Sequence, residues 1–272
     1  MEILYYIFLG FIQGITEPIP VSSSGHILVI KEILEKFTNS VSKIDFETFA
    51  TITNFGSFLA IFIIFRKDIF RLIINFFTYL KKKDKKLEYD YKYCWYMVFA
   101  TIPAGIMGIL VTKLDIFEKL EDNVKIIGLM LVVTAFFLYL IKDFKGKKEK
   151  LTLLDAMTVG FFQVVALLPG ISRSGATITG AMFSGINRNE AFNFSFMLYL
   201  PISVATMILG VKDLLEISVS GTMWIYYIIG AFVSFIFTYI STLWFRNIVK
   251  DGKLMIFSWY CLVVGILVVL FL

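Results

Sequence analysis

Two segments of this chain correspond to each other at an offset of 150 residues, and both place polar side chains within long hydrophobic stretches. The first reads QGITEPIPVSSSGH at residues 13–26, and the second reads QVVALLPGISRSGA at residues 163–176. A glutamine, two serines and a glycine occupy the same places in both. Polar groups are costly inside a membrane and usually mark a functional site. Duplicated, broken segments in the two halves of a chain point to where that site lies.

The composition indicates an all-α polytopic membrane protein. Of the 272 residues, 58% are hydrophobic and only 17% are charged, which is not typical of a soluble domain. Apolar stretches of about 20 residues, the length that crosses hydrocarbon as a helix, recur between charged segments. The sequence therefore predicts six transmembrane helices, at residues 46–65, 93–112, 125–141, 191–211, 223–245 and 254–272.

Two further apolar segments, at residues 3–36 and 153–187, are interrupted by helix-breaking residues. Pro18 and Pro20 interrupt the first, and Pro169 and Gly170 interrupt the second. Irregular backbone at membrane depth is tolerated where it lies inside the protein or lines a wet cavity. We therefore predict that each segment is a re-entrant helical hairpin, which enters and leaves on the same face.

The predicted elements form a single membrane domain over residues 1–272, built as an inverted repeat of residues 1–150 and 151–272. Each half is one hairpin followed by three crossings, and three is odd, so the second half should lie upside down relative to the first. Most of the 26 Lys and Arg residues then fall on one side, which the positive-inside rule assigns to the cytoplasm. The hairpins would enter from opposite faces and meet near the midplane.

The net charge of +5 does not indicate a nucleic-acid partner. Its densest basic run, at residues 81–86, is a loop in a membrane protein, where such clusters contact the anionic headgroups of the lipid bilayer.

The first break combines a carboxylate, serines and the only histidine of the chain. Gln13 and Glu17 are four residues apart and share a helix face. After the prolines, the serines at residues 22–24 are typical caps for the next helix. His26 can reach the hydroxyl of Ser22 or Ser23 within one turn. A hydroxyl beside a base is the minimal set for an activated nucleophile.

The second break supplies a complementary cation. Ser172, Arg173 and Ser174 open a second half-helix, and Thr177 follows one turn after the arginine. Arginine binds phosphate oxygens in a fork, and helix N-termini attract anions. A nearby carboxylate would offer a place for a divalent cation that bridges phosphates. The natural ligand is a phosphate or diphosphate on a molecule that arrives through the membrane.

Purely structural interpretations exist for each residue alone. A single histidine near a helix start is often structural, and serine runs often only cap helices. Glu17 could be a gating or ion-coupling carboxylate in a transporter, or could pair with Arg173 for structure alone. Their convergence in one apolar chain favours a functional site.

Both motifs resemble those of the undecaprenyl-diphosphatase family, the bacitracin-resistance type of membrane phosphatase. The family's first signature, (E/Q)xxxE followed by PVSSxGH, is matched by residues 13–17 and 20–26, and its second, PGxSRSGAT, by residues 169–177. The resemblance covers the whole chain. It implies a hydrolase that converts undecaprenyl diphosphate to undecaprenyl phosphate and inorganic phosphate.

The resemblance also implies a biological setting. The reaction recycles the lipid carrier for peptidoglycan synthesis, and so serves cell wall biogenesis and cell shape, and it confers resistance to the antibiotic bacitracin. The resemblance places the protein in the bacterial plasma membrane, with an active site that faces the extracytoplasmic side. It further implies dependence on a divalent cation, Mg²⁺ or Ca²⁺.

Residue roles follow from the resemblance position by position. Glu17 matches the essential carboxylate that contacts metal or diphosphate, and Ser23 matches the proposed nucleophile. His26 matches its base or leaving-group acid, and Arg173 matches the phosphate clamp. Gln13 stands where a glutamate is more common, so a metal held by Glu17 and Gln13 would bind more weakly. The expected substrate-binding residues are Gln13, Ser22, Ser24, Ser172, Ser174 and Thr177.

Several alternatives stay open at this point. The intermediate could be a phosphoserine or a phosphohistidine, or water could attack directly. Inverted repeats with broken helices are also a transporter layout, so a polyprenyl-lipid flippase, with or without hydrolase activity, is the main alternative. A type-2 lipid acid phosphatase is disfavoured, because the second histidine it needs is replaced by Thr179. The sequence leaves open whether the chain forms a homodimer.

Overall fold

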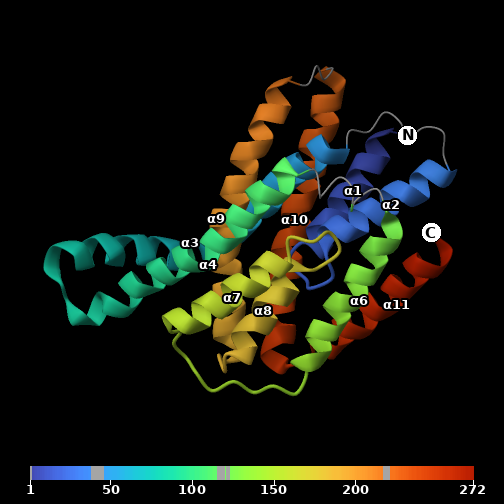
Figure 1. Ribbon diagram of the computed structural model, residues 1–272. Helices are drawn as coiled ribbons and strands as arrows, with labels where there is room; N and C mark the ends of the chain where they lie inside the picture. Colours follow the sequence, from blue (N-terminus) through green and yellow to red (C-terminus); the bar gives the residue numbers. More distant parts are fainter. Residues whose placement is uncertain (1, 38–45, 115–119, 121–122, 217–220) are drawn as a thin grey trace.

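The computed structural model describes residues 2–37, 46–114, 120, 123–216 and 221–272, and within these ranges it is helical and contains no β-strand (Figure 1). The helices are α1 (Glu2–Thr16), α2 (Ser23–Phe37), α3 (Phe46–Lys82), the short 3-10 helix η2 (Lys85–Leu87), α4 (Glu88–Lys113), α6 (Val124–Leu140), α7 (Leu153–Val165), α8 (Arg173–Phe183), α9 (Arg188–Glu216), α10 (Gly221–Asp251) and α11 (Met255–Phe271).

Four of the described helices, α3, α4, α9 and α10, are long and apolar enough to cross a membrane. Helices α6 and α11 are also apolar but have only 17 residues each, and they pack against each other. The prediction of an all-α polytopic membrane protein is confirmed at this level. The finer arrangement of six crossings and two re-entrant hairpins stays a prediction.

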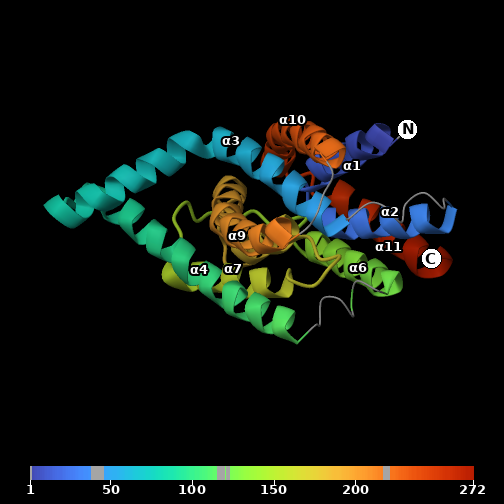
Figure 2. The same cartoon turned by 90° about the horizontal axis from the view of Figure 1, so that it is seen from above.

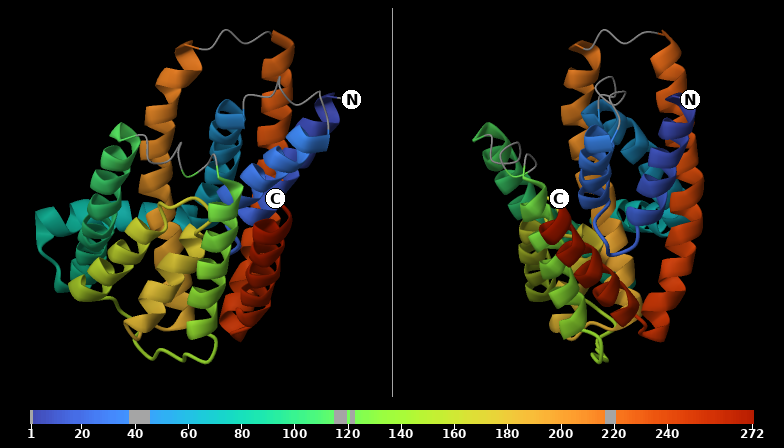
Figure 3. Two further views of the ribbon diagram at one scale, coloured as in Figure 1. Left: turned by 45° about the vertical axis from the view of Figure 1, so that its right-hand side comes forward. Right: turned by 90° about the vertical axis from the view of Figure 1, so that its right-hand side faces the viewer.

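Each predicted broken segment consists of two short helices joined by a turn. Helices α1 and α2 contact each other, as do α7 and α8, and both pairs reverse direction at their turns (Figure 3). Proline and glycine explain the interruptions. Pro18 lies two residues after the end of α1 and has no N–H to continue the helix. Gly170, after α7, has φ +93°, a conformation that favours glycine.

The loop predicted after residue 65 is instead largely helical. Helix α3 continues to Lys82, and after η2 the chain returns as α4. Asn75 donates a hydrogen bond of 2.6 Å to Asp90, and Phe76 stacks on Tyr91 with ring centroids 5.1 Å apart. The paired helix ends project to the side of the other helices (Figures 1 and 2). Such contacts between distant residues outweigh the local charge that suggested a loop.

Small and polar residues allow close packing of α1 and α3 against α10. A Cβ atom at Gly10 would lie 2.4 Å from the Gly230 carbonyl oxygen, so only glycine fits there. The hydroxyl of Ser57 is hydrogen bonded to both Ser234 and Thr238 of α10, at 2.9 Å each. Hydrogen bonds of this kind join helices in apolar surroundings. They hold α3, which carries part of the site, against α10.

Candidate active site

The two breaks meet each other in the interior of the protein. A Cβ atom at Gly175 would lie 3.2 Å from the Cβ of Pro20, and one at Gly25 would lie 3.2 Å from the Cα of Gly170. The turns are therefore in van der Waals contact. Residues that lie 150 positions apart in the sequence are brought to one place.

Helices α6 and α11 support the two turns from one side. On α6, the Thr134 hydroxyl donates to the Gly170 carbonyl at 3.2 Å and accepts from the Ser172 N–H at 3.0 Å. On α11, the Cys261 thiol donates to the Pro20 carbonyl at 3.6 Å. Buried backbone groups that the breaks leave unpaired are costly, and these side chains satisfy several of them.

Serines cap both helices that leave the breaks. The Ser22 hydroxyl accepts from the Gly25 N–H at 3.2 Å, and the Ser172 hydroxyl accepts from the Gly175 N–H at the same distance. This is the N-cap arrangement. It places the next residues, Ser23 and Arg173, in equivalent positions at the first turn of α2 and α8.

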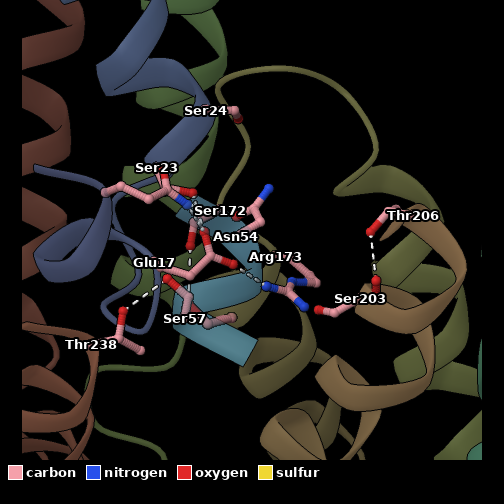
Figure 4. Close-up of polar contacts among 12 residues, drawn as sticks. Glu17, Ser23, Ser24, Asn54, Ser57, Ser172, Arg173, Ser203, Thr206 and Thr238 are labelled. Carbon is pink, nitrogen blue, oxygen red and sulfur yellow. Dashed lines mark hydrogen bonds and ion pairs between the residues drawn. The ribbon is translucent and has the colours of Figure 1, made fainter. Parts of the chain in front are cut away.

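Both of these residues contact the same carboxylate. Arg173 donates from Nη2 to Oε1 of Glu17 at 2.6 Å, and the Ser23 hydroxyl donates to Oε2 at 2.5 Å. Figure 4 shows Glu17 between them. The Glu17 side chain is only 7% exposed. Buried charges need a partner, and here a guanidinium and a hydroxyl both supply one.

The network extends to an amide pair that holds the carboxylate from the other side. Gln13 donates from Nε2 to Glu17 Oε2 at 3.0 Å and to Asn54 Oδ1 at 2.7 Å. Asn54 lies on α3 and was not predicted. An asparagine inside the apolar stretch 46–65 was the available signal, because amides are rare and functional at membrane depth.

These residues line a cavity of about 410 Å³, within the size range of small-molecule sites. Its lining includes the predicted residues Gln13, Glu17, Ser22, Ser23, Ser24, Ser172, Arg173 and Ser174. It also includes polar residues that were not predicted, namely Thr16, Lys31, Asn54, Tyr199, Ser203 and Thr206. The polar groups lie among apolar ones such as Ile27, Leu167 and Ile202. The cavity could therefore hold a charged headgroup next to an apolar chain.

Of the three adjacent serines, Ser23 alone is hydrogen bonded to Glu17 in the part of the chain that the structure describes. Ser22 is buried and serves as the cap. Ser24 is exposed and lies away from the carboxylate in Figure 4; its hydroxyl is 3.4 Å from that of Ser22. The spacing alone could not rank the three serines, and the family resemblance pointed to Ser23; the contacts to Glu17 also favour Ser23.

His26 is placed differently from the prediction. Its Nδ1 lies 2.8 Å from the Ser22 carbonyl oxygen, which can only accept, so Nδ1 carries a proton. Its Nε2 lies 2.8 Å from the hydroxyl of Tyr260, on α11, and the two rings stack. The ring therefore contacts the carbonyl of Ser22 rather than a serine hydroxyl, and among the described residues His26 is not part of the cavity lining.

Thr177 also lies outside the cavity lining formed by the described residues. Its hydroxyl donates to the Arg173 carbonyl at 2.8 Å and is hydrogen bonded to Ser195 of α9 at 2.6 Å. It is 1% exposed. In this structure the Thr177 hydroxyl joins α8 to α9, and its role in substrate binding stays a prediction.

Comparison with known proteins decides the family. The family model described as "Bacitracin resistance protein BacA" matches residues 6–267. The chain belongs to this family. It is 40% identical to the undecaprenyl-diphosphatase of Oceanobacillus iheyensis, covering 99% of this chain and 97% of the relative. It is also 40% identical to undecaprenyl-diphosphatase 1 of Bacillus licheniformis, over 100% of this chain and 98% of the relative.

The site offers few side chains that could act as ligands of a divalent cation. The described residues contain no group of three or more His, Cys, Asp or Glu side chains that could hold a metal ion. They do offer the Glu17 carboxylate with the neutral oxygens of Ser23 and Asn54. Mg²⁺ is commonly bound by one or two carboxylates together with substrate phosphates. The donors therefore fit a cation that binds jointly with a diphosphate.

Gln13 was predicted to be the second metal ligand. It presents its N–H groups to Glu17 and Asn54. Its amide would have to turn over before its oxygen could face a cation held by Glu17.

Proposed function

We propose that this protein hydrolyses undecaprenyl diphosphate to undecaprenyl phosphate and inorganic phosphate. The names of its relatives support this substrate. The observation that carries the proposal is the meeting of Ser23 and Arg173 on the two oxygens of one buried carboxylate. A nucleophile, a base and an anion-binding group thereby line a single cavity, as phosphoryl transfer requires.

The contacts support Ser23 as the nucleophile and Glu17 as its base. As the Ser23 oxygen attacks the terminal phosphorus, its proton passes to Glu17 Oε2, to which it is already hydrogen bonded. The bond between that phosphorus and the bridging oxygen breaks, and undecaprenyl phosphate leaves. Water then attacks the phosphoserine, releases inorganic phosphate and regenerates the hydroxyl. Glu17 gives the first proton to the leaving phosphate oxygen, and in the second step it takes a proton from the attacking water and returns it to the Ser23 oxygen.

Arg173 would hold the transferring phosphoryl group during this reaction. Its guanidinium presents several N–H donors in one plane, and charge on the phosphate oxygens is best stabilised by such preorganised donors. The ion pair with Glu17 keeps it in place before substrate arrives. A divalent cation, Mg²⁺ or Ca²⁺, held by Glu17 and the diphosphate would neutralise charge on the phosphate oxygens.

His26 fits a supporting function better than that of base to Ser23. A neutral imidazole has one acceptor nitrogen, and in His26 that nitrogen faces Tyr260. The contacts of the ring instead link the first break to α11. Two alternatives remain for the attack on the terminal phosphorus. His26 could attack and form a phosphohistidine, or water could attack directly.

The same proposal includes the arrangement in the membrane. We place six helices across the bilayer, with α1–α2 and α7–α8 as re-entrant hairpins in inverted repeats over residues 1–150 and 151–272. The basic loops would face the cytoplasm and the cavity the extracytoplasmic side. Recycling of the lipid carrier for peptidoglycan and bacitracin resistance would follow from this activity.

The test is phosphate release from undecaprenyl diphosphate by the purified protein, with and without a chelator of divalent cations. The unaltered protein should release phosphate, and the chelator should reduce the rate. Glu17→Gln should lower the rate by about 10³-fold, because it removes the base and the partner of Arg173. Arg246→Ala, which removes an exposed arginine outside the cavity, is the matched control.

Two results would contradict the proposal. One is phosphate release by Glu17→Gln at the rate of the unaltered protein. The other is no release by the unaltered protein in detergent together with translocation of the labelled lipid across vesicles. The second result would favour the flippase.

A further inference from the structure

Tyr199 lies directly against the arginine of the site. It belongs to α9, is only 4% exposed, and lines the cavity. The Cζ atom of Arg173 lies 4.1 Å from the centre of its ring. A guanidinium over an aromatic face is attracted by the π-electrons, most strongly where water is excluded. The ring therefore restrains the guanidinium on one face.

Glu17 restrains the same guanidinium at one edge. Nη2 is hydrogen bonded to Glu17, whereas Nη1 is buried and has no hydrogen-bond partner among the described residues. An unpaired, buried N–H is costly and calls for an explanation. The ring and the carboxylate together fix the guanidinium, and Nη1 remains as a donor that a bound anion would satisfy.

Arg173 would have room to move if the ring were removed. A second, smaller cavity of about 10 Å³ adjoins the site, and its lining includes Glu17, Arg173, Ser174, Ser195 and Tyr199. At that size it accommodates about one water molecule. Shortening Tyr199 would enlarge this space and let the guanidinium rotate away from the main cavity.

We propose that Tyr199 is a positioning residue whose ring face orients Arg173 to bind the diphosphate group of the substrate. The inference rests on the proposed function only for the identity of the lipid. The chemistry it names is the diphosphate itself, which a free inorganic diphosphate shares with a lipid headgroup. Tyr199 acts through Arg173 rather than on the reacting atoms.

The experiment measures the binding of inorganic pyrophosphate to the purified protein in detergent by titration calorimetry, beside kcat and KM for undecaprenyl diphosphate. Tyr199→Phe keeps the ring and should bind pyrophosphate within about 3-fold of the unaltered protein. Tyr199→Leu removes the ring and should weaken pyrophosphate binding by about 10-fold, as expected for the loss of a desolvated cation–π contact. KM for the lipid should rise with it, and kcat should change less.

Controls separate positioning from packing. Tyr227→Leu removes an equally buried tyrosine away from the cavity and should leave pyrophosphate binding unchanged. If Tyr199→Leu does not fold, as judged by thermal unfolding, Tyr199→Met is measured in its place, because the flexible methionine side chain fills a core gap without offering a ring.

Three results would overturn the inference. The first is unchanged pyrophosphate binding in Tyr199→Leu. The second is a loss of affinity in Tyr199→Phe equal to that in Tyr199→Leu, which would assign the effect to the hydroxyl. The third is the absence of pyrophosphate binding by the unaltered protein. Pyrophosphate binding with no lipid hydrolysis would instead contradict the proposed function and leave the inference standing.

Discussion

The turns after α1 and after α7 have the same cap geometry but different strain. Ser22 and Ser172 each accept a hydrogen bond from a glycine N–H three residues on, at 3.2 Å in both cases. At Ser172 the backbone is extended, with φ −71°. At Ser22 φ is +68°, in the left-handed region that serine rarely adopts. In the second turn a positive φ falls on Gly170 instead, where it costs little.

The two turns also differ in what surrounds them. Helix α8 is buried from Ser174 to Met182, whereas α2 is exposed at Ser24 and Ile33. The first residue of each helix is different as well, Ser23 in one and Arg173 in the other. The first copy, which is strained and more accessible, thus carries a hydroxyl, and the second copy, whose helix is buried, carries a guanidinium. Strain of this kind often accompanies functional sites.

The largest expected effect comes from removing the hydroxyl of Ser23, the first residue of α2. Ser23→Ala should lower kcat for undecaprenyl diphosphate by at least about 10³-fold, as expected for the loss of a nucleophile. Ser24→Ala is the matched control and should lose less than about 3-fold, since its hydroxyl does not contact Glu17. Equal, small losses in both variants would exclude a serine nucleophile and favour water.

Substitution of Arg173, which occupies the equivalent position at the start of α8, should give the next largest effect. Arg173→Ala should lower kcat/KM by about 10²- to 10³-fold, because it removes preorganised donors to the phosphate. Arg173→Lys keeps the charge without the planar fork and should recover only part of the loss. Full recovery by lysine would show that the site needs charge alone, and would also weaken the case for the ring of Tyr199.

His26, on α2, has no counterpart on α8, where Ala176 occupies the equivalent position. His26→Ala should lower kcat by only about 5- to 10-fold, the size expected for lost hydrogen bonds rather than for a lost base. Tyr260→Phe should give a similar loss, and the double variant should lose little more, because the two side chains share one contact. A loss of 10³-fold in His26→Ala with normal activity in Tyr260→Phe would restore histidine as the base.

The difference between the turns also shows what the sequence can predict. The breaks and their caps follow from local chemistry, that is, from prolines, glycines and serines at fixed spacing. The offset of the two motifs then suggested that Glu17 and Arg173 belong to one site, and the structure brings them to 2.6 Å.

Contacts from other helices could not be predicted in the same way. Asn54 and Tyr199 were read as parts of apolar crossings, and no periodicity relates them to the motifs. The partner of His26 is 234 residues away, so the motif alone favoured a serine hydroxyl as its neighbour. Helix α3 was expected to end at residue 65 because charged residues follow, but it continues to Lys82 and its end packs against α4, where Asn75 contacts Asp90 and Phe76 contacts Tyr91.

The smallest expected effect tests the strain itself. Ser22→Gly loses the cap bond, at a cost of a few tenths of a kcal/mol, and the greater freedom of glycine in the unfolded chain costs about 0.4–1 kcal/mol. Because glycine adopts a positive φ without steric cost, the substitution also stabilises the folded protein by about 1–2 kcal/mol. The free energy of unfolding should therefore rise by about 0.5 kcal/mol relative to that of the unaltered protein. Ser172→Gly gains no such relief and should lower it by about 1 kcal/mol. Thermal unfolding of both variants in the same detergent makes the comparison. An equal loss of stability in both would show that Ser22 is not strained in the folded protein, and that the two turns differ only in the side chains they carry.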